Sequence, residues 1–538
     1  MASANIHAVE LVFLLLLVFV VAFSTLARKL QLPYPIVLVI AGLLLSFVPG
    51  IPKITMNPDV IFLAVLPPLL YSAAWFTSWR DFTYNIVSIL FLAFGLVAFT
   101  VLGVAQAAHW TFSGFDWRLG FVLGAVVATT DAIAATSIAK RIGLPQRIVD
   151  ILEGESLVND ATGLLALEFG VAMVVQGQTP TLTSGVFRLI YLMAIGIGVG
   201  LVIALIVEQL HRHLDDGPIE VLLTIMVPYA AYLAAEAANA SGVLAVVACG
   251  LYLSRRSTHL FSPDVRLQAF GFWNSFIFAL NGLVFVLIGL QLPFVMAGIR
   301  EYRLPSLLLY GALFSALLIA LRLVWIYPGT YVANLIRRRV FHQNEPRPSA
   351  RAIFVVGWTG MRGVIALAAA VSLPESLANG SPFPQRNLII FLTFSVILVT
   401  LVLQGLTLPP LIRALGLATT GGPNTEEREA RRLMLEAALK HLEEKRTADE
   451  SRELAAAYDD LDMHYRRRLA FSQESTTEDG IDAADHARAI DLSRQLLRIE
   501  RQTAVHLRNQ GNINDEVLRQ LERELDLSET RLDAKSHD

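Results

Sequence analysis

Cysteine is nearly absent from this chain, since Cys249 is the only one among 538 residues. A single cysteine excludes any disulfide within the chain and leaves the redox compartment undetermined. Charge is also scarce over residues 1–415, where long apolar runs are interrupted only by short polar breaks. That scarcity excludes an ordinary soluble domain and predicts a membrane protein.

Long apolar runs are what the sequence has instead. Hydrophobic residues make up 54% of the chain, and a run of roughly 17–25 apolar residues fits a helix that crosses a bilayer. Thirteen such runs are predicted, at 9–27, 34–49, 58–75, 85–108, 118–139, 149–176, 186–208, 218–238, 241–254, 268–293, 305–328, 350–373 and 388–411. We therefore expect an all-α polytopic membrane domain over residues 1–415.

The predicted loops differ in positive charge. Fifteen Lys and Arg residues fall in one set of alternate loops, including Arg337, Arg338 and Arg339, and six fall in the other set. The positive-inside rule assigns the richer set to the cytoplasm. The N-terminus is then expected outside the cell membrane and the C-terminal tail inside, as an odd number of spans requires.

Composition changes abruptly after Thr419-Thr420. Residues 421–538 hold 27 acidic and 19 basic residues, against 19 acidic and 24 basic residues before them. Apolar residues recur there at helical spacing, as in Leu492, Leu496 and Ile499, which predicts a charged helical cytoplasmic domain. We favour an amphipathic bundle that pairs with its dimer mate over a regulatory role. Since no nucleotide-binding glycine motif or nucleic-acid module is present, the partner of the tail stays open.

The fifth predicted span holds an acidic residue among small and hydroxylated ones. Thr130 and Asp131 lie in the middle of Val126–Ser137, a stretch rich in Ala, Thr and Ser. Small residues allow helices to approach closely, and hydroxyls satisfy backbone groups that a helix break leaves free. We expect an unwound segment whose carbonyl oxygens, together with Asp131, face a hard cation.

The sixth predicted span concentrates polar residues. On a helix, Glu155, Ser156, Asn159 and Asp160 fall within an arc of about 140°, and Glu153 precedes them. Polar residues in a span often only hold helices together, but three carboxylates within eight residues are expensive at membrane depth and indicate an ion or proton pathway. Asp160 is the strongest candidate, and Glu155 is expected to be structural because it needs a positive partner.

Glycines surround an arginine in the twelfth predicted span. The segment Gly357–Gly363 holds three glycines beside Arg362, which predicts a break and a costly buried charge. We predict a Glu155–Arg362 ion pair between the sixth and twelfth spans. Arg322, in the eleventh span, is a second buried arginine. The sequence leaves its partner open among the acidic residues Glu168, Glu220 and Glu236.

The order of the spans suggests an internal repeat. If the seventh span is a linker, spans 1–6 and 8–13 form two six-helix halves of opposite orientation. The broken fifth and twelfth spans then correspond and cross, which is the sequence pattern typical of a transporter binding site.

Five segments resemble motifs of the monovalent cation/proton antiporters of the NhaP and NHE type, the sodium/proton exchangers. They occur in the family's order and span most of residues 1–415, whereas the tail adds nothing. The string Glu-Gly-Glu-Ser-x-x-Asn-Asp is highly specific. The segments are Thr130-Asp131, Leu152–Thr162, Ser241–Val247, Asn281–Gln291 and Gly360–Gly363.

The resemblance implies a homodimer in which a core moves against a dimer scaffold, as in the NhaA-like fold. It implies that Asp160 binds the cation and a proton in turn, and that Ser156 and the Thr130 backbone complete the cation site. Asp131 and Asn159 would shape this site, and Glu155 would pair with Arg362. The Asn before the key aspartate implies electroneutral exchange of one cation for one proton.

Two departures from the family pattern concern the site. Many relatives have an acidic residue after the Pro-Pro of the third span, but Pro67–Ser72 has none, which leaves Ser72 as a weak substitute. The family's Asp-Pro is Asp131-Ala132 here, which alters the expected geometry of the break.

Together these features predict a secondary transporter that exchanges sodium, with lithium or potassium as alternatives, for protons and serves pH homeostasis. No cofactor is expected, because the cation and proton are cargo. A potassium-preferring antiporter of the same fold and a cation channel are the rival interpretations. An intramembrane enzyme is disfavoured, since no Gly-x-Gly-Asp motif or Ser/His pair occurs at membrane depth.

Overall fold

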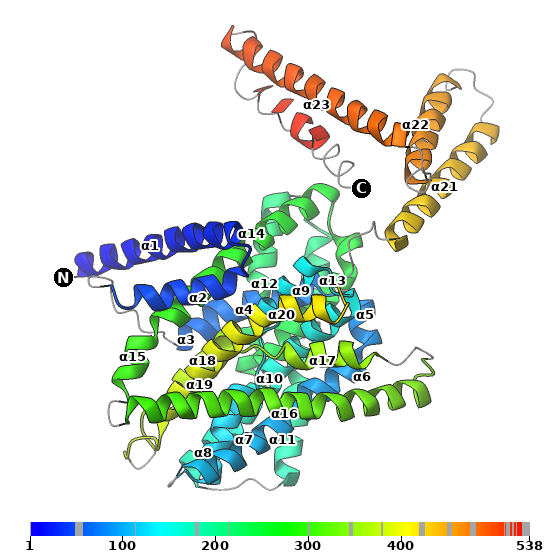
Figure 1. Cartoon of the computed structure of the whole chain (residues 1–538). Coiled ribbons are helices and arrows are strands. Elements are labelled where there is room, and N and C mark those ends of the chain that lie inside the picture. The colour runs from blue at the N-terminus through cyan, green and yellow to red at the C-terminus, as the bar shows by residue number, and fades with distance from the viewer. Residues whose placement is uncertain are drawn as a thin grey trace. The chain divides into compact units, whose positions relative to one another are not determined.

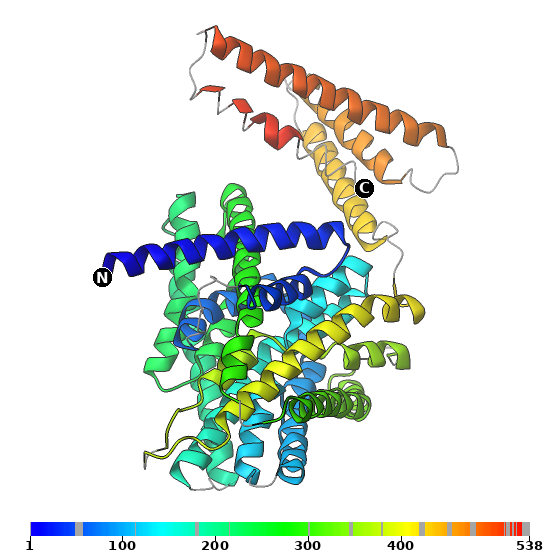
Figure 2. The same cartoon turned by 60° about the vertical axis from the view of Figure 1, so that its left-hand side comes forward.

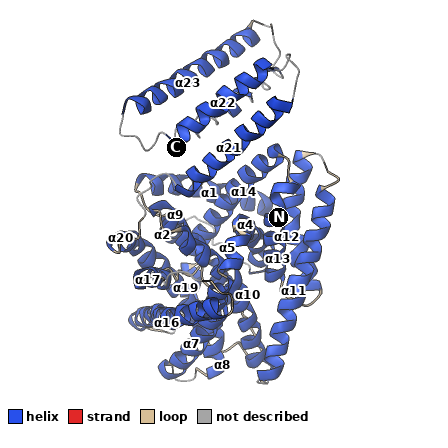
Figure 3. Cartoon of the chain, turned by 90° about the vertical axis from the view of Figure 1, so that its right-hand side faces the viewer, coloured by secondary structure: helices blue, strands red, loops and turns tan. Residues whose placement is uncertain are grey.

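The structure is a computed structural model of the whole chain. It forms two units, Met1–Thr419 and Thr420–Asp538, and residues 419–424, next to the predicted domain boundary, lie outside the described part. The structure describes residues 2–48, 58–112, 115–177, 182–214, 216–299, 302–343, 348–377, 380–418, 425–448, 455–473, 480–510, 512, 517–518, 521–522 and 524–529. In these ranges every regular element is helical, as Figure 3 shows.

The first unit is a bundle of packed helices (Figure 1). Those before residue 180 are α1 (Ala2–Lys29), α2 (Tyr34–Leu45), α3 (Pro58–Val60), η1 (Ile61–Val65), α4 (Leu66–Phe76), α5 (Trp79–Tyr84), α6 (Ile86–Leu90), η2 (Phe91–Leu96), α7 (Val97–Thr111), α8 (Trp117–Ala128), α9 (Ala132–Ile142) and α10 (Gln146–Gln176). Those after it are α11 (Leu182–His211), α12 (Gly217–Ala237), α13 (Gly242–Leu260), α14 (Pro263–Leu290), α15 (Leu292–Ala297), α16 (Leu304–Arg339), α17 (Ala350–Trp358), α18 (Val364–Val371), α19 (Arg386–Val399), η3 (Thr400–Gln404) and α20 (Gly405–Ala414).

Within the described ranges, nine helical stretches are long and apolar enough to cross a membrane, and α2 is a shorter apolar helix. The expectation of a polytopic all-α domain is therefore confirmed. Each of the predicted span ranges contains at least one helix, but the count of thirteen spans and the inverted repeat stay predictions.

Close backbone contact holds α8, the helix that precedes Thr130. A Cβ on Gly120 would stand 2.7 Å from the carbonyl oxygen of Ala105, and a Cβ on Gly124 would stand 2.7 Å from that of Val101. Because glycine has no side chain, α8 packs directly on the backbone of α7. This contact fixes the end of α8, where the first break begins.

Two spans are interrupted, as the sequence predicts. The helix of α8 ends at Ala128 and α9 begins at Ala132, while α17 ends at Trp358 and α18 begins at Val364. The backbone N–H of Asp131 donates to the carbonyl oxygen of Met361 over 2.8 Å. The two breaks therefore touch inside the bundle, and Figure 2 gives a second view of these helices.

The second unit is also helical. Its main helices are α21 (Thr425–Ala448), α22 (Ala455–Gln473) and α23 (Gly480–Asn509). Arg501 of α23 makes ion pairs with Asp526 at 2.6 Å and with Glu529 at 2.9 Å. Its cytoplasmic location stays a prediction.

Candidate functional site

Thr130 connects the first break to α10. Its carbonyl oxygen accepts a hydrogen bond from Oγ of Ser156 at 2.8 Å. Its hydroxyl accepts one from the amide of Asn159 and faces Oε1 of Glu155 at 3.4 Å. Three of the four residues that the sequence placed around one arc, Glu155, Ser156 and Asn159, therefore contact the break, although Ser156 is only partly buried.

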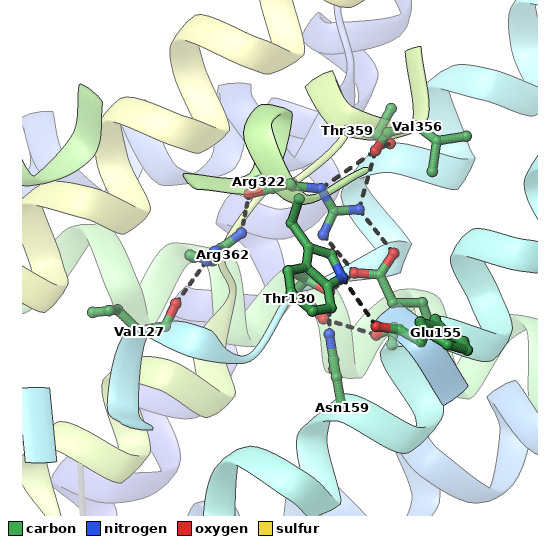
Figure 4. Close-up of polar contacts among 12 residues, drawn as sticks. Val127, Thr130, Glu155, Asn159, Arg322, Val356, Thr359 and Arg362 are labelled. Atoms are coloured by element: carbon green, nitrogen blue, oxygen red, sulfur yellow. Dashed lines mark hydrogen bonds and ion pairs between the residues drawn. The ribbon is translucent and has the colours of Figure 1, made fainter. Parts of the chain in front are cut away.

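Glu155 forms an ion pair with Arg322 of α16. Nη1 of Arg322 lies 2.5 Å from Oε1 of Glu155, and Nη2 lies 2.8 Å from Oε2. Both side chains are 1% exposed. The guanidinium also donates to the carbonyl oxygen of Val356, at 3.3 Å from Nε and 3.1 Å from Nη2. A bidentate contact of this kind is the strong form of a charge-assisted hydrogen bond, and Figure 4 shows it beside Thr130 and Asn159.

The predicted Glu155–Arg362 pair is therefore wrong, because Arg322 takes the carboxylate. Arg362 instead donates from Nε to the carbonyl oxygen of Val127 at 2.8 Å and from Nη1 to that of Gly360 (Figure 4). The last carbonyls of a helix lack partners within the helix, so an arginine beside a helix break finds backbone acceptors there. The carboxylate of Glu155 still acts electrostatically on Arg362 without forming an ion pair with it.

The contact between Arg322 and Glu155 also shows that none of the three candidate partners named for Arg322 is the one that it binds. Glu168 lies 3.3 Å from Arg188, and Glu220 lies 3.2 Å from His211. Arg322 was expected to pair with one of these or Glu236, but its carboxylate is that of Glu155.

Asp131 caps the second half of the broken span. Its Oδ1 accepts the backbone N–H of Ile133 at 2.8 Å, which is a hydrogen bond of the first turn of α9. The carboxylate also packs against Gly363, where an added Cβ would overlap it. Gly363 precedes α18, so Asp131 lies at the N-terminal ends of two half-helices, where negative charge is stabilised.

The crossing of the two breaks is compensated at each helix end. Asp131 lies at the N-terminal ends of α9 and α18, Arg362 contacts the last turn of α8, and Arg322 contacts the last turn of α17. The N-terminal end of a helix carries partial positive charge and the C-terminal end partial negative charge. Each charged side chain therefore has the opposite sign to the partial charge of the helix end that it contacts.

Asp160 differs from these charged groups. It is 4% exposed, and in the part of the chain that the structure describes its carboxylate makes no hydrogen bond or ion pair. The carboxylates of Asp131 and Glu155 both act on it electrostatically. A buried carboxylate without a positive partner is strongly disfavoured, so Asp160 requires a bound cation or a proton.

Asn159, the residue before Asp160, offers a second oxygen. The amide nitrogen of Asn159 donates to Thr130, whereas Oδ1 is buried and has no hydrogen-bond partner among the described residues. Oxygen atoms are the ligands that hard cations prefer. The carboxylate of Asp160 and Oδ1 of Asn159 are thus side-chain oxygens of the predicted site that accept no hydrogen bond from the described residues.

Ser72, the weak substitute for the family's acid, turns toward its own helix. Its hydroxyl donates to the carbonyl oxygen of Leu69 at 2.9 Å, and the side chain is buried. The hydroxyl hydrogen of Ser72 is therefore used in a hydrogen bond within α4.

Thr400 is a site-supporting residue that sequence analysis missed. Its hydroxyl accepts the backbone N–H of Arg362 at 3.2 Å, at the start of the π-helix η3. A lone threonine in an apolar run gives no distinguishing signal.

Among the described residues, no group of three or more His, Cys, Asp and Glu side chains could hold a metal ion.

Comparison with known proteins gives consistent matches. The family model described as "Sodium/hydrogen exchanger, transmembrane" matches residues 14–414. An uncharacterized Na+/H+ exchanger of Mycobacterium tuberculosis (strain ATCC 25618 / H37Rv) is 33% identical over 521 residues, which cover 95% of this chain and 94% of the relative. The sodium, potassium, lithium and rubidium/H+ antiporter of Bacillus pumilus is 33% identical over 464 residues, covering 84% and 67%.

Among solved structures, the sodium proton antiporter MjNhaP1 from Methanocaldococcus jannaschii at pH 8 is similar with a TM-score of 0.60. The match covers 77% of this chain and 100% of that chain at 20% identity. At that identity the similarity concerns the fold alone.

Proposed function

We propose, on the premise that this chain belongs to the sodium/hydrogen exchanger family, that the carboxylate of Asp160 carries a monovalent cation and a proton in turn. Members of this family are transporters that exchange cations for protons across the membrane, and they are not enzymes. Sodium is the proposed cation, exchanged one for one with a proton.

The observation that carries the proposal is the uncompensated charge of Asp160. Glu155 has Arg322, Asp131 has the N-terminal ends of two half-helices, and Arg362 has backbone carbonyls. Asp160 has no such partner within the described residues and is buried. A single positive charge, from either a cation or a proton, neutralises it, and so the two cargoes compete for one carboxylate.

The same charge argument explains exchange rather than leak. A neutral loaded site crosses the low-dielectric interior, whereas the bare carboxylate is held back by its desolvation cost. The cation would be bound by Asp160, Ser156 and the carbonyl oxygen of Thr130, with Oδ1 of Asn159 beside them. Asp131 and Thr130 hold the break in the shape that presents these oxygens.

The wider setting follows from the same proposal. The protein would act as a homodimer in the plasma membrane, its N-terminus outside and its tail in the cytoplasm, and would serve pH homeostasis. The excess of basic loops on one side supports this orientation.

The test replaces Asp160 by Asn in purified protein reconstituted into liposomes. We expect sodium-dependent proton flux to fall to the level of empty liposomes, because a neutral amide neither takes up and releases a proton in this pH range nor offers a negative charge to the cation. Asp150→Asn is the matched control, since Asp150 lies on the same helix but contacts Gln146 at 2.9 Å in an exposed pair. Substantial exchange by a folded Asp160→Asn protein would refute the assignment.

A potassium-preferring exchanger of the same fold is the second candidate, favoured by the name of the Bacillus pumilus relative, which includes potassium. Proton flux against equal gradients of sodium, lithium and potassium separates the two. Electroneutrality is tested in the same liposomes, because a one-for-one exchange is insensitive to an imposed membrane potential.

A further inference from the structure

A second pair of titratable side chains lies where α11 ends and α12 begins. Nδ1 of His211 lies 3.2 Å from Oε2 of Glu220, and the side chains are 1% and 5% exposed. The imidazole packs against the ring of Phe261, with 4.8 Å between the centroids. His211 and Glu220 therefore form a buried acid–base pair that the exchange at Asp160 does not use.

The charged neighbours on α11 and α13 are compensated without His211. Glu208, one turn earlier on α11, lies 2.6 Å from Arg212 and accepts the hydroxyl of Tyr252 at 2.7 Å. Arg256 of α13 also acts electrostatically on Glu208. Glu208 is thus engaged elsewhere and does not contact the imidazole.

The charged neighbours on α12 and α14 are at the surface, apart from Glu220. Asp216 is exposed and accepts the backbone N–H of Ile219 at 3.3 Å, which caps α12. Asp264, in the first turn of α14, is exposed, and Arg266 is partly exposed. The carboxylate in contact with His211 is therefore that of Glu220.

The geometry indicates which atom takes up the proton. Nδ1 faces Glu220, and an ionised carboxylate only accepts hydrogen bonds, so with Glu220 ionised Nδ1 is the donor in both states of the ring. Nε2 is buried and has no hydrogen-bond partner among the described residues. Without a proton on Nε2 the pair keeps the single negative charge of Glu220 in a buried setting, and with it the pair is neutral. Histidine is the side chain whose charge changes near neutral pH.

We propose that His211 and Glu220 form a second proton-binding site, separate from Asp160, that sets the pH at which exchange begins. This inference rests on the proposed function for its effect on transport. The site lies at the end of α11 followed by Arg212, on the side that the basic loops assign to the cytoplasm.

Aromatic contacts connect this site with the helix of Asp160. Phe261, which touches His211, lies 5.4 Å from Trp75, and Trp75 lies 5.6 Å from Tyr71, both of them centroid distances. Trp75 and Tyr71 belong to α4, which packs against α10. These rings and the packing of α4 on α10 form a continuous line of contacts, through which we expect a change of charge at His211 to act on the helix of Asp160.

The transport test compares His211→Gln with the wild-type protein in liposomes over pH values from about 5 to 9. We expect the pH midpoint of exchange to shift by about one unit, the effect of removing one close ionisable partner. The KM for sodium at the plateau should stay unchanged, because the site does not touch the cation. His213→Gln is the matched control, since His213 is exposed and lies two residues away. An unaltered midpoint in a folded His211→Gln protein would overturn the proposal.

A second measurement does not depend on transport. Histidine-selective nitrogen NMR on the full chain in nanodiscs follows the imidazole of His211, identified by its loss in His211→Gln. We expect it to titrate over the same pH range, and to bind its proton about tenfold less tightly in Glu220→Gln, because the negative partner is gone. An imidazole that does not titrate disproves this site even if exchange at Asp160 is confirmed, and titration persists if the exchange assignment fails.

Discussion

At the scale of single residues, the charged side chains of the site differ in their partners: Glu155 and Arg322 form an ion pair, Asp131 and Arg362 bind backbone groups, and Asp160 has neither kind of partner among the described residues. Glu155 and Arg322 neutralise each other through two hydrogen bonds with both side chains almost fully buried. Burying two charges is expensive, so such a pair adds little net stability, but the loss of one partner leaves an uncompensated charge. The pair therefore holds α10 against α16, and Asp160 is the carboxylate that our proposal assigns to the cargo.

The ion pair can be tested by Glu155→Gln. We expect the free energy of unfolding to fall by about 3–5 kcal/mol, because the guanidinium of Arg322 stays buried without a counter-charge. Denaturant unfolding in detergent measures the loss. A second variant, Glu155→Leu with Arg322→Met, removes both charges and should lose less than the sum of the single changes.

The exposed pair Arg188–Glu168 is the control for this prediction. Its side chains are 40% and 57% exposed and lie 3.3 Å apart, so Glu168→Gln should change stability by about 1 kcal/mol or less. Equal losses for Glu155→Gln and Glu168→Gln would contradict the role of burial.

At the scale of elements, the site depends on two helices that stop and restart. The halves are short, eleven residues in α9 and eight in α18, and their ends meet through Asp131 and Met361. Helix ends leave backbone groups without partners. Placing the breaks together lets a few side chains and backbone groups satisfy several ends at once, beside Asp160.

Gly363→Ala tests this arrangement of the ends. The new Cβ would overlap the carboxylate of Asp131, so we expect Asp131 to move from the first turn of α9. Stability should fall by about 1–3 kcal/mol, the usual effect of overpacking, and the rate of exchange should fall with it. Thermal unfolding and liposome flux measure the two effects.

Gly271→Ala provides the comparison on another helix of the bundle. Nothing lies within 4 Å of a Cβ at Gly271 in α14, and alanine favours a helix over glycine. This variant should be neutral or slightly more stable. A Gly363→Ala protein that transports and unfolds like wild type would contradict this prediction, because it would show that the helix ends accommodate the added methyl group beside Asp131.

At the scale of the whole molecule, the chain forms two units that differ in chemistry. Residues 1–419 are largely apolar and hold the site and the described partners of its residues, while the tail is charged and its described elements are helical. The described hydrogen bonds and ion pairs of Thr130, Glu155 and Arg322 lie within the first unit.

A chain that ends at residue 418 should keep sodium-dependent proton flux at saturating sodium. The physical reason is that Glu155, Arg322, Thr130 and Asp160 have all their described contacts within the first unit. Flux per protein in liposomes is the measurement. Loss of flux in a folded truncated protein would mean that the tail takes part in transport itself.

The sequence by itself determined the features that depend on neighbouring residues. Apolar runs located the helices, and helical periodicity grouped Ser156, Asn159 and Asp160 on one side of α10, because both patterns repeat within a few turns. Small and hydroxylated residues before Asp131 and glycines around Arg362 indicated the breaks for the same local reason. The composition step near Thr419 likewise marked where the apolar unit ends.

Only the tertiary structure decided which charges meet. Arg322 and Arg362 are both buried arginines, and no spacing along the chain shows which one faces Glu155. That choice depends on how α16 and α17 cross α10, which long-range packing sets. The position of Asp131 over Gly363, the support from Thr400, and the burial of His211 beside Glu220 have the same origin, since each joins helices that are distant in sequence or separated by a turn.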